Sequence, residues 1–328
     1  KSVSLFNQGY QCPWLQHGVW QVDASGQPTL MRPDYFTNVN GKAVSFNQDY
    51  FKPFAARYTQ MVRSVDKDAM IFLEAVPNTH SPEYAPGELS NTVYAVHWYD
   101  DMVLVLKRFF PWLGYDTLTD TIAFGAKKIR KVFAGTHAIV KREAIEKMGG
   151  IPTLIGEIGI PFDLNGRKAY KTGNFRDQER ALDRSLKALD DNLLSYTLWN
   201  YTSDNTNERG DMWNDEDLSL FSRDQQTDPK DINSGGRAVR VFARPYPLKT
   251  AGEPTLLEFD PFSGKFAFEF KGDPALKAPT EIYFPAVHYG KGYQVIVSDG
   301  SYEVDTAAQL LTYHAGSAEV HRVEITRR

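Results

Sequence analysis

The sequence has 328 residues, of which 42% are hydrophobic and 24% charged, the proportions of a globular protein with a sizeable core. The net charge of −4 and a pI near 6.0 argue against nucleic acid as a partner, because such proteins usually carry basic patches. The single cysteine, Cys12, excludes an intrachain disulfide framework. No stretch approaches the roughly 20 apolar residues that span a bilayer.

The compartment stays open. One cysteine and no visible signal peptide favour a cytoplasmic location, or one associated with the vacuole or a membrane. The chain begins at Lys1 without a methionine and looks trimmed, so the missing signal peptide carries little weight.

Helices and strands alternate along the first three quarters of the chain. Residues 1–46 are aromatic-rich and lack a clear period, which predicts long loops or an insertion. Periodicity, capping residues and turn residues then predict helices and strands in sequence. We expect helices at 47–66 (Pro53 in the first turns), 117–148 (ended by Gly149-Gly150) and Asn174–191, and strands at 69–76, 92–99, 153–161 and 193–201.

Strands that alternate with helices indicate a parallel sheet. Only four strands are found, however, and a (β/α)8 barrel needs eight. A polar, acidic loop follows at 202–237. After Arg244-Pro-Tyr-Pro247, apolar and polar residues alternate between turns, which is typical of an antiparallel β-sandwich. The predicted domains are 1–245 and 246–328. Sandwich strands are expected at 256–260, 265–270, 281–284, 293–297 and 318–325.

Glu157 lies in an otherwise apolar strand, Thr153-Leu-Ile-Gly-Glu-Ile-Gly-Ile-Pro161. A buried, unpaired carboxylate costs several kcal/mol, so it is normally paired, protonated or used. Its place near the C-terminal end of a barrel-like strand makes it the leading catalytic candidate. A structural ion pair is the alternative.

His97 and Tyr99 are two residues apart on one strand, so their side chains share a face and both could reach Glu157. A buried His–Tyr pair that the backbone satisfies is the alternative. Trp199 could form a platform under a sugar ring, or could be plain core. Glu74 could bind substrate, act as a second acid, or pair with an arginine.

Other site chemistries find no support in the sequence. The acidic cluster Asp211 to Asp217 lacks a Ca²⁺-loop pattern and is interpreted as a solvated loop, so no metal is expected. Gly-x-Ser-x-Gly and glycine-rich phosphate loops are missing, and no cofactor is expected. Carboxylate chemistry remains.

Together these motifs resemble the second half of a glycoside hydrolase family 5 enzyme, in the branch related to endoglycoceramidases and fungal glycolipid β-glucosidases. The resemblance rests on Glu74-Ala-Val-Pro-Asn78, His97-Trp98-Tyr99, Gly156-Glu157-Ile158-Gly159, Trp199 within Leu-Trp-Asn-Tyr, and Arg244-Pro-Tyr-Pro. It implies strands five to eight of a TIM barrel followed by a β-sandwich.

The resemblance also implies roles. Glu157 would be the nucleophile of retaining hydrolysis, and His97 and Tyr99 would orient and tune it. Trp199 would line the glucose site, and Glu74, Asn78 and Trp98 would complete substrate binding.

One family motif is missing. The acid/base glutamate of the family lies in Asn-Glu-Pro after strand four, and the chain contains only Asn207-Glu208, in the acidic loop. We therefore expect strands one to four and the acid/base glutamate upstream of Lys1, as the N-terminal half of the same protein and a separate chain after cleavage. Half a barrel exposes sheet edges, so this chain should be neither stable nor active alone.

The leading functional hypothesis is a retaining β-glucosidase acting on a steryl β-glucoside. Glucosylceramidase or endoglycoceramidase activity is an alternative, and a non-catalytic carbohydrate- or glycolipid-binding protein is another. Tyr10, Trp14, Trp20 and the stretch Phe109-Phe110-Pro111-Trp112-Leu113 could form an apolar aglycone pocket or a membrane-facing lip, or could be packed loops.

Overall fold

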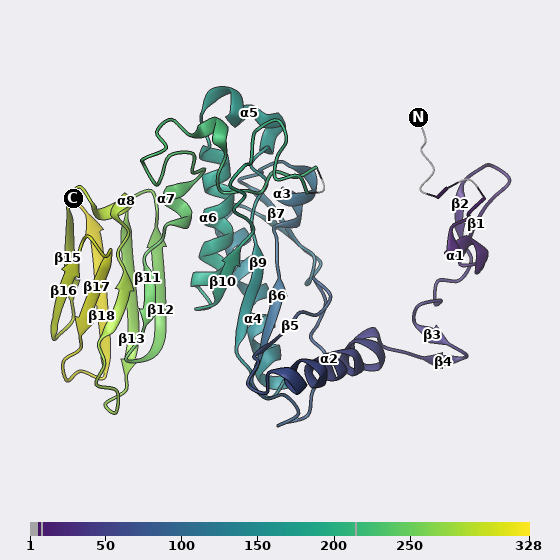
Figure 1. Ribbon diagram of the computed structural model, residues 1–328, viewed down its shortest axis with the longest axis horizontal. Helices are drawn as coiled ribbons and strands as arrows, with labels where there is room; N and C mark the ends of the chain where they lie inside the picture. The colour runs from purple at the N-terminus through teal and green to yellow at the C-terminus, as the bar shows by residue number, and fades with distance from the viewer. Residues whose placement is uncertain (1–5, 8, 214) are drawn as a thin grey trace. The chain divides into compact units, whose positions relative to one another are not determined.

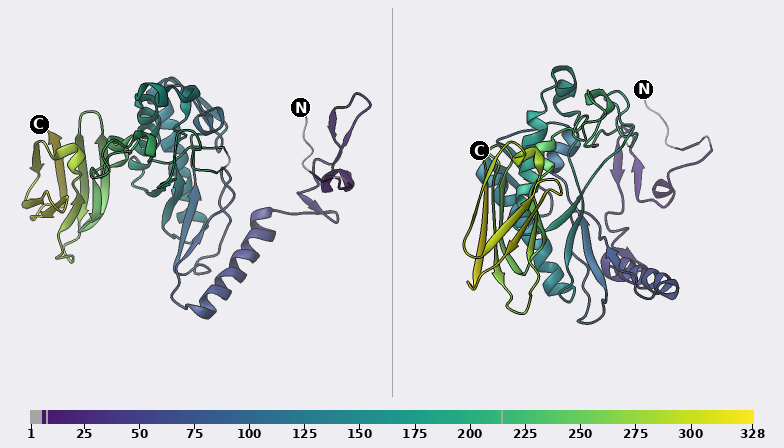
Figure 2. Two further views of the ribbon diagram at one scale, coloured as in Figure 1. Left: turned by 45° about the horizontal axis from the view of Figure 1, so that its top comes forward. Right: turned by 60° about the vertical axis from the view of Figure 1, so that its left-hand side comes forward.

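The computed structural model describes residues 6–7, 9–213 and 215–328 (Figure 1). The chain forms two compact units, Lys1–Ala69 and Met70–Arg328. The second unit contains a parallel sheet with its helices and an antiparallel sandwich, which Figure 2 shows in two further orientations.

The described part of the first unit is built from short hairpins and helices, of which α2 is the longest. The predicted irregular segment in fact contains two hairpins; its residues 1–5 and 8 lie outside the described residues. In the first hairpin the Asp23 carboxylate accepts hydrogen bonds from the backbone N–H groups of Ser25 and Gln27, and this local turn leaves no periodic signal. The elements are α1 (Pro13–Gln16), β1 (Trp20–Val22), β2 (Pro28–Leu30), β3 (Asn38–Val39), β4 (Lys42–Ala43), the π-turn η1 (Phe46–Phe51) and α2 (Lys52–Val65).

Helix α2 confirms the helix predicted at 47–66, although its first residues form the π-turn η1 instead. Pro53 lies at the second helical position, where the missing N–H costs nothing. An apolar stripe on α2 stays exposed within this unit: Phe54, Tyr58, Met61 and Val65 are 63%, 54%, 71% and 92% exposed.

The second unit opens with four parallel strands in the order β10-β9-β6-β5, which confirms the four predicted strands and their direction. Each strand is shorter than predicted, because the residues beyond it turn into the loops that carry polar side chains. The strands are β5 (Ile71–Leu73), β6 (Thr92–His97), β9 (Thr153–Ile158) and β10 (Ser195–Leu198). The helices between them are α3 (Asp101–Leu106), α4 (Ala126–Lys147), α5 (Leu164–Thr172) and α6 (Arg176–Asp190).

The helix predicted to begin at residue 117 begins only at Ala126. Residues before it form an antiparallel hairpin of β7 (Leu113–Asp116) and β8 (Thr121–Phe124). The Asp116 carboxylate accepts a hydrogen bond from the Thr119 backbone N–H and so fixes the turn. Gly125, with a φ of 87°, separates the hairpin from the helix. The helix ends as predicted, at Gly149 and Gly150, both with positive φ.

Helix α6 confirms the third predicted helix, with Leu182, Leu186 and Leu189 fully buried on its inner face. Its start differs by one residue, because Phe175 is the N-cap. Asn174 lies one position earlier and accepts a hydrogen bond from the backbone N–H of Arg176.

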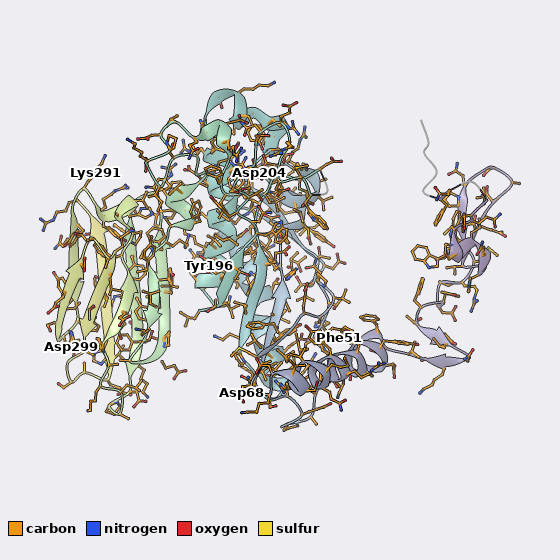
Figure 3. The ribbon with its side chains drawn as sticks, viewed as in Figure 1. Phe51, Asp68, Tyr196, Asp204, Lys291 and Asp299 are labelled. Carbon is orange, nitrogen blue, oxygen red and sulfur yellow. The ribbon has the colours of Figure 1, made fainter. Side chains whose placement is uncertain are left out.

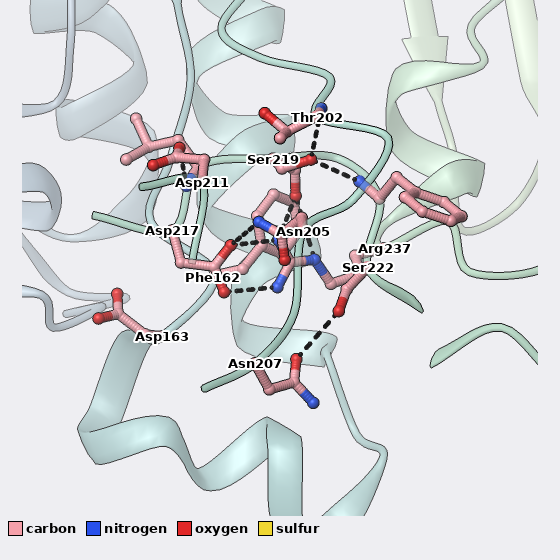
Figure 4. A network of polar contacts seen from close by, with 12 residues as sticks. Phe162, Asp163, Thr202, Asn205, Asn207, Asp211, Asp217, Ser219, Ser222 and Arg237 are labelled. Carbon is pink, nitrogen blue, oxygen red and sulfur yellow. Dashed lines mark hydrogen bonds and ion pairs between the residues drawn. The ribbon is translucent and has the colours of Figure 1, made fainter. Parts of the chain in front are cut away.

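The acidic loop 202–237 contains the cluster Asp211 to Asp217, which was predicted to be solvated. Asp217 is buried instead, whereas Met212, Trp213 and Asp215 are exposed. Arg237 is fully buried and makes a two-pronged ion pair with Asp217 (Figure 4). Tyr170 and Asn205 donate hydrogen bonds to the same carboxylate. Burial alone would raise the pKa of Asp217, but the hydrogen bonds and charge of Arg237 lower it below its ordinary value. The loop also contains the short helix η2 (Arg223–Gln225).

The C-terminal part is the predicted antiparallel sandwich, and its two four-stranded sheets have the strand orders β11-β14-β17-β16 and β12-β13-β18-β15. The prediction missed β11 and the β16–β17 hairpin. Its elements are α7 (Val239–Phe242), β11 (Tyr246–Lys249), β12 (Gly252–Asp260), β13 (Lys265–Gly272), β14 (Thr280–Tyr283), α8 (Ala286–Tyr289), β15 (Tyr293–Val297), β16 (Ser301–Asp305), β17 (Leu310–His314) and β18 (Val320–Arg327).

Buried aromatic and aliphatic side chains from both sheets fill the sandwich core, Phe268, Phe270 and Leu311 among them. At the edge of this core, Asp299 (labelled in Figure 3) accepts hydrogen bonds from the Tyr313 hydroxyl at 2.6 Å and from His321 Nδ1 at 2.8 Å. These contacts satisfy two buried polar side chains, so this cluster has a structural explanation.

Candidate active site

The C-terminal ends of the parallel strands gather the polar side chains that the sequence singled out. His97, at the end of β6, lies opposite Glu157 of β9 in the strand register, and Glu74 directly follows β5. Parallel strands end at the same edge of a sheet, which is why residues 83 positions apart in sequence meet here.

The Glu157 carboxylate is held by two neighbours. The Tyr99 hydroxyl donates a hydrogen bond to Glu157 Oε1 at 2.5 Å, and His97 Nδ1 lies 3.5 Å from Glu157 Oε2. Burial, and then the hydrogen bond to Glu157, raises the pKa of the Tyr99 hydroxyl well above its ordinary value. Tyr99 therefore stays protonated at neutral pH and can only donate to the carboxylate.

Glu74 pairs with His97, not with the arginine that is the usual partner of such a residue. The distance from Glu74 Oε1 to His97 Nδ1 is 3.0 Å. One imidazole nitrogen therefore lies between two carboxylates. All three side chains are partly accessible, with exposed fractions of 43% for Glu74, 28% for His97 and 23% for Glu157. A substrate could therefore reach both carboxylates.

Trp199 directly follows β10, and its backbone N–H donates to the carbonyl of Ile158 at 2.8 Å. Gly159 allows this close approach, because a Cβ at that position would lie 2.2 Å from the Trp199 carbonyl oxygen. The half-buried Trp199 is thus fixed beside the strand that carries Glu157.

The structure does not bring Trp98 and Asn78 into the Glu157 cluster. Trp98 is 5% exposed and packs edge-on against Phe133 and His137 of α4, because successive strand residues alternate between faces. Asn78 adopts a positive φ and donates a hydrogen bond to Asp101 at 3.2 Å.

Sequence reasoning missed a second group of polar residues, from the acidic loop. Burial, followed by the charge of Asp211, raises the pKa of Glu216, and Glu157 adds to this effect. Lys107 Nζ donates to the Asp163 carboxylate at 2.9 Å and to the Asp215 carbonyl at 2.7 Å, so it ties three loops together. The dense run of acidic residues in 211–217 was the only sequence signal for this group. The polar composition of the run favoured a solvent-exposed loop instead.

Nothing in the described ranges suggests a metal ion or a membrane span. Among residues 6–7, 9–213 and 215–328, no group of three or more His, Cys, Asp or Glu side chains is arranged to hold a metal ion. Within the same ranges no helix is long and apolar enough to cross a membrane.

Comparison with known proteins identifies the family. The cellulase model of glycosyl hydrolase family 5 matches residues 34–205, more than half of the chain. The chain belongs to glycoside hydrolase family 5. The model of the family 5 C-terminal domain matches residues 244–326, the sandwich sheets.

Two of the similar proteins come from fungi. The chain is 32% identical to a glucosylceramidase of Rhizopus delemar, over 85% of the chain and 44% of that protein. It is 25% identical to an ergosteryl-beta-glucosidase of Saccharomyces cerevisiae, over 92% of the chain and 48% of that protein.

Among solved structures, sterylglucosidase 1 of Cryptococcus neoformans matches with a TM-score of 0.85 and 32% identity, over 96% of the chain and 49% of that protein. The chain thus spans about half the length of these three proteins.

Proposed function

We propose that the intact protein containing this chain is a retaining β-glucosidase that removes glucose from a glycolipid, in the first place a steryl β-glucoside, with Glu157 as nucleophile. The observation that carries the proposal is the contact of the Glu157 carboxylate with Tyr99 and His97 at the C-terminal edge of the parallel sheet. The names of the fungal relatives, ergosteryl-beta-glucosidase and glucosylceramidase, support the substrate class.

In this mechanism the Glu157 carboxylate attacks the anomeric carbon while the bond to the aglycone oxygen breaks, and the acid/base carboxyl protonates that leaving oxygen. Water, activated by the same acid/base group, then hydrolyses the glycosyl ester and frees Glu157. The Tyr99 hydroxyl fixes the direction of one carboxylate oxygen and leaves the other for attack. His97, which pairs with Glu74, lies 3.5 Å from the second oxygen and can hydrogen-bond a sugar hydroxyl. Trp199 forms the wall against which the apolar face of glucose packs.

Retaining hydrolysis also needs a second carboxyl about 5 Å from the first. We propose that this acid/base glutamate belongs to a further part of the protein, which supplies strands one to four of a (β/α)8 barrel and completes the domain that includes residues 1–245. Two exposed apolar surfaces support this proposal. Phe72, on the edge strand β5, is 54% exposed, and α2 carries its exposed stripe.

Glu74 is the alternative acid/base within this chain. A substrate with an activated aryl leaving group distinguishes the two assignments, because it needs no protonation of the leaving oxygen. If Glu74 is the acid, Glu74→Gln should abolish hydrolysis of steryl glucoside and spare that of the aryl glucoside. If Glu74 only positions His97, both activities should fall together.

The function is tested with the intact protein and its Glu157→Gln variant, on steryl glucoside, glucosylceramide and a longer glycosphingolipid. We expect the wild type to release glucose with retained configuration, fastest from steryl glucoside, and the variant to bind glycolipid without hydrolysing it. Preference for glucosylceramide would favour the activity named for the Rhizopus relative. Glycolipid binding without any hydrolysis by the wild type would identify a binding protein and refute the proposal.

A further inference from the structure

The β7–β8 hairpin has two unlike faces. Its inner face packs on α4: Ala123 is fully buried, and a Cβ on Gly114 would lie 2.8 Å from the Ile129 side chain. Its outer face carries Ile122 and Phe124, which are 56% and 62% exposed. The hairpin therefore presents an apolar face that the described residues leave uncovered.

Trp112 extends this outer face. Its ring stacks on Phe124 with centroids 6.4 Å apart and an interplanar angle of 15°, and it is itself 56% exposed. The backbone N–H of Gly125 donates to the Trp112 carbonyl at 2.7 Å, which fixes the pair at the open end of the hairpin. We call Trp112, Ile122 and Phe124 the hairpin patch.

Buried polar contacts hold the segment before the patch in place. Arg184, 9% exposed and paired with Asp100, donates from Nη1 to the Phe110 carbonyl at 3.0 Å. The backbone N–H of Phe109 donates to Asn165 Oδ1 at 3.3 Å. The patch is therefore a preformed surface rather than the tip of a loose loop.

Basic residues border the patch in the sequence on both sides. Arg108 precedes Trp112 by four residues, and Lys127 and Lys128 follow Phe124 on the first turn of α4. All three are exposed, and none makes an ion pair with the residues that the structure describes. The hairpin acids are already engaged, Asp116 by Thr119 and Asp120 by Tyr115. This local excess of positive charge stands out in a chain with a net charge of −4.

We propose that the hairpin patch and its basic border dock the protein on an anionic lipid bilayer. Exposed tryptophan and phenylalanine side chains partition into the interface of a bilayer, and nearby lysine and arginine side chains are attracted to acidic headgroups. The hairpin belongs to the loop that follows Tyr99, so docking would hold the Glu157 site beside the surface in which glycolipids reside.

The test is sedimentation of the intact protein with phosphatidylcholine vesicles, with and without phosphatidylserine. We expect the wild type to bind only the anionic vesicles, and less at high salt. Lys127→Gln with Lys128→Gln should weaken binding roughly 30-fold, because each lysine near an anionic surface contributes about a factor of five. Trp112→Ala with Phe124→Ala should weaken it on the order of tenfold or more.

The matched control is Tyr302→Ala with Lys291→Gln, an exposed aromatic and a lysine of the sandwich, which should bind like the wild type. Hydrolysis of a soluble aryl glucoside should be unchanged in Lys127→Gln with Lys128→Gln and in the sandwich control. Vesicle binding is measured without any hydrolysis. The docking proposal can therefore fail while the proposed function holds, and the reverse.

Failure of the wild type to bind anionic vesicles would overturn the proposal. Binding of both double variants as tight as that of the wild type would also overturn it. If the wild type does not bind and Trp112→Ala with Phe124→Ala lowers the melting temperature of the intact protein, another part of the protein covers the patch, and the proposal is equally wrong.

Discussion

The hydroxyl of Tyr99 lies 2.5 Å from Glu157 Oε1, and it reaches the carboxylate from the segment that directly follows the neighbouring strand β6. A tyrosine with a raised pKa is a fixed donor, so this contact holds one oxygen of Glu157 whatever the pH near neutrality.

Tyr99→Phe removes this hydrogen bond and little else. Because hydrogen bonds to charged groups contribute about 1.5–3 kcal/mol, kcat/KM should fall roughly 10- to 100-fold, mostly through kcat. Tyr115→Phe is the matched control, since Tyr115 also donates to a carboxylate, Asp120, but in the hairpin. Steady-state kinetics of the intact protein check this, and a loss confined to KM would assign Tyr99 to substrate binding alone.

His97 lies between Glu74 and Glu157, so the effects of changing His97 and Glu74 should not add. We expect Glu74→Gln and His97→Asn each to lower kcat/KM, and the double variant to be better than the product of the two by a coupling of about 0.5–3 kcal/mol. A double-mutant cycle measures this. Additive effects would mean that the 3.0 Å contact has no functional weight.

The Asp217–Arg237 pair should dominate the stability of the acidic loop. Arg237→Met leaves the buried Asp217 carboxylate without its cation, which should cost about 3–5 kcal/mol. Adding Asp217→Leu should restore much of this loss. The partly exposed pair of Arg209 and Asp204 is the control, and Arg209→Met should change the free energy of unfolding by less than roughly 1 kcal/mol. Denaturant unfolding of the intact protein measures the free energy of unfolding of the wild type and of the three variants.

His137 should make the protein acid-sensitive. It is fully buried, neither ring nitrogen has a hydrogen-bond partner among the described residues, and burial lowers its pKa from 6.5 to about 3. The unfolded state therefore binds a proton below pH 6.5 that the folded state does not, and stability falls as the pH falls. Between pH 6.5 and 5 this amounts to about 1.6 kcal/mol.

His137→Gln should remove that part of the pH dependence, which unfolding at several pH values will show. His288, whose pKa burial also lowers, should contribute in the same direction and remain in the variant. Carboxylates whose pKa is lowered in the folded state, such as Glu143, reduce the stability only at lower pH, where they become protonated. His314→Gln, an exposed position, serves as the control; an unchanged slope in His137→Gln would contradict the prediction.

Much of the fold was accessible from sequence because its signals are local. Apolar runs gave the four strands, and the alternation of strand residues placed His97 and Tyr99 on one face toward Glu157. The β7–β8 hairpin was missed because a local turn at Asp116 and one glycine, Gly125, outweigh helical composition.

Ion pairs and hydrogen bonds between side chains far apart in the sequence could not be predicted from it. Arg237 and Asp217 are 20 residues apart in a polar loop, and no periodicity indicates that they are buried together. The partnership of Glu74 with His97 instead of an arginine likewise depends on which strands become neighbours.

Arg244 lies at the start of the sandwich, and its side chain contacts elements on both sides of the junction. It is 3% exposed, pairs with Asp183 and Asp190 of α6, and stacks on Phe259 of β12 at 5.1 Å. These buried contacts make the junction between α6 and the sandwich rigid rather than a flexible linker. A truncation after Ala243 would strip two buried carboxylates of their cation, so the sandwich cannot be removed without damaging the helix that it leaves behind.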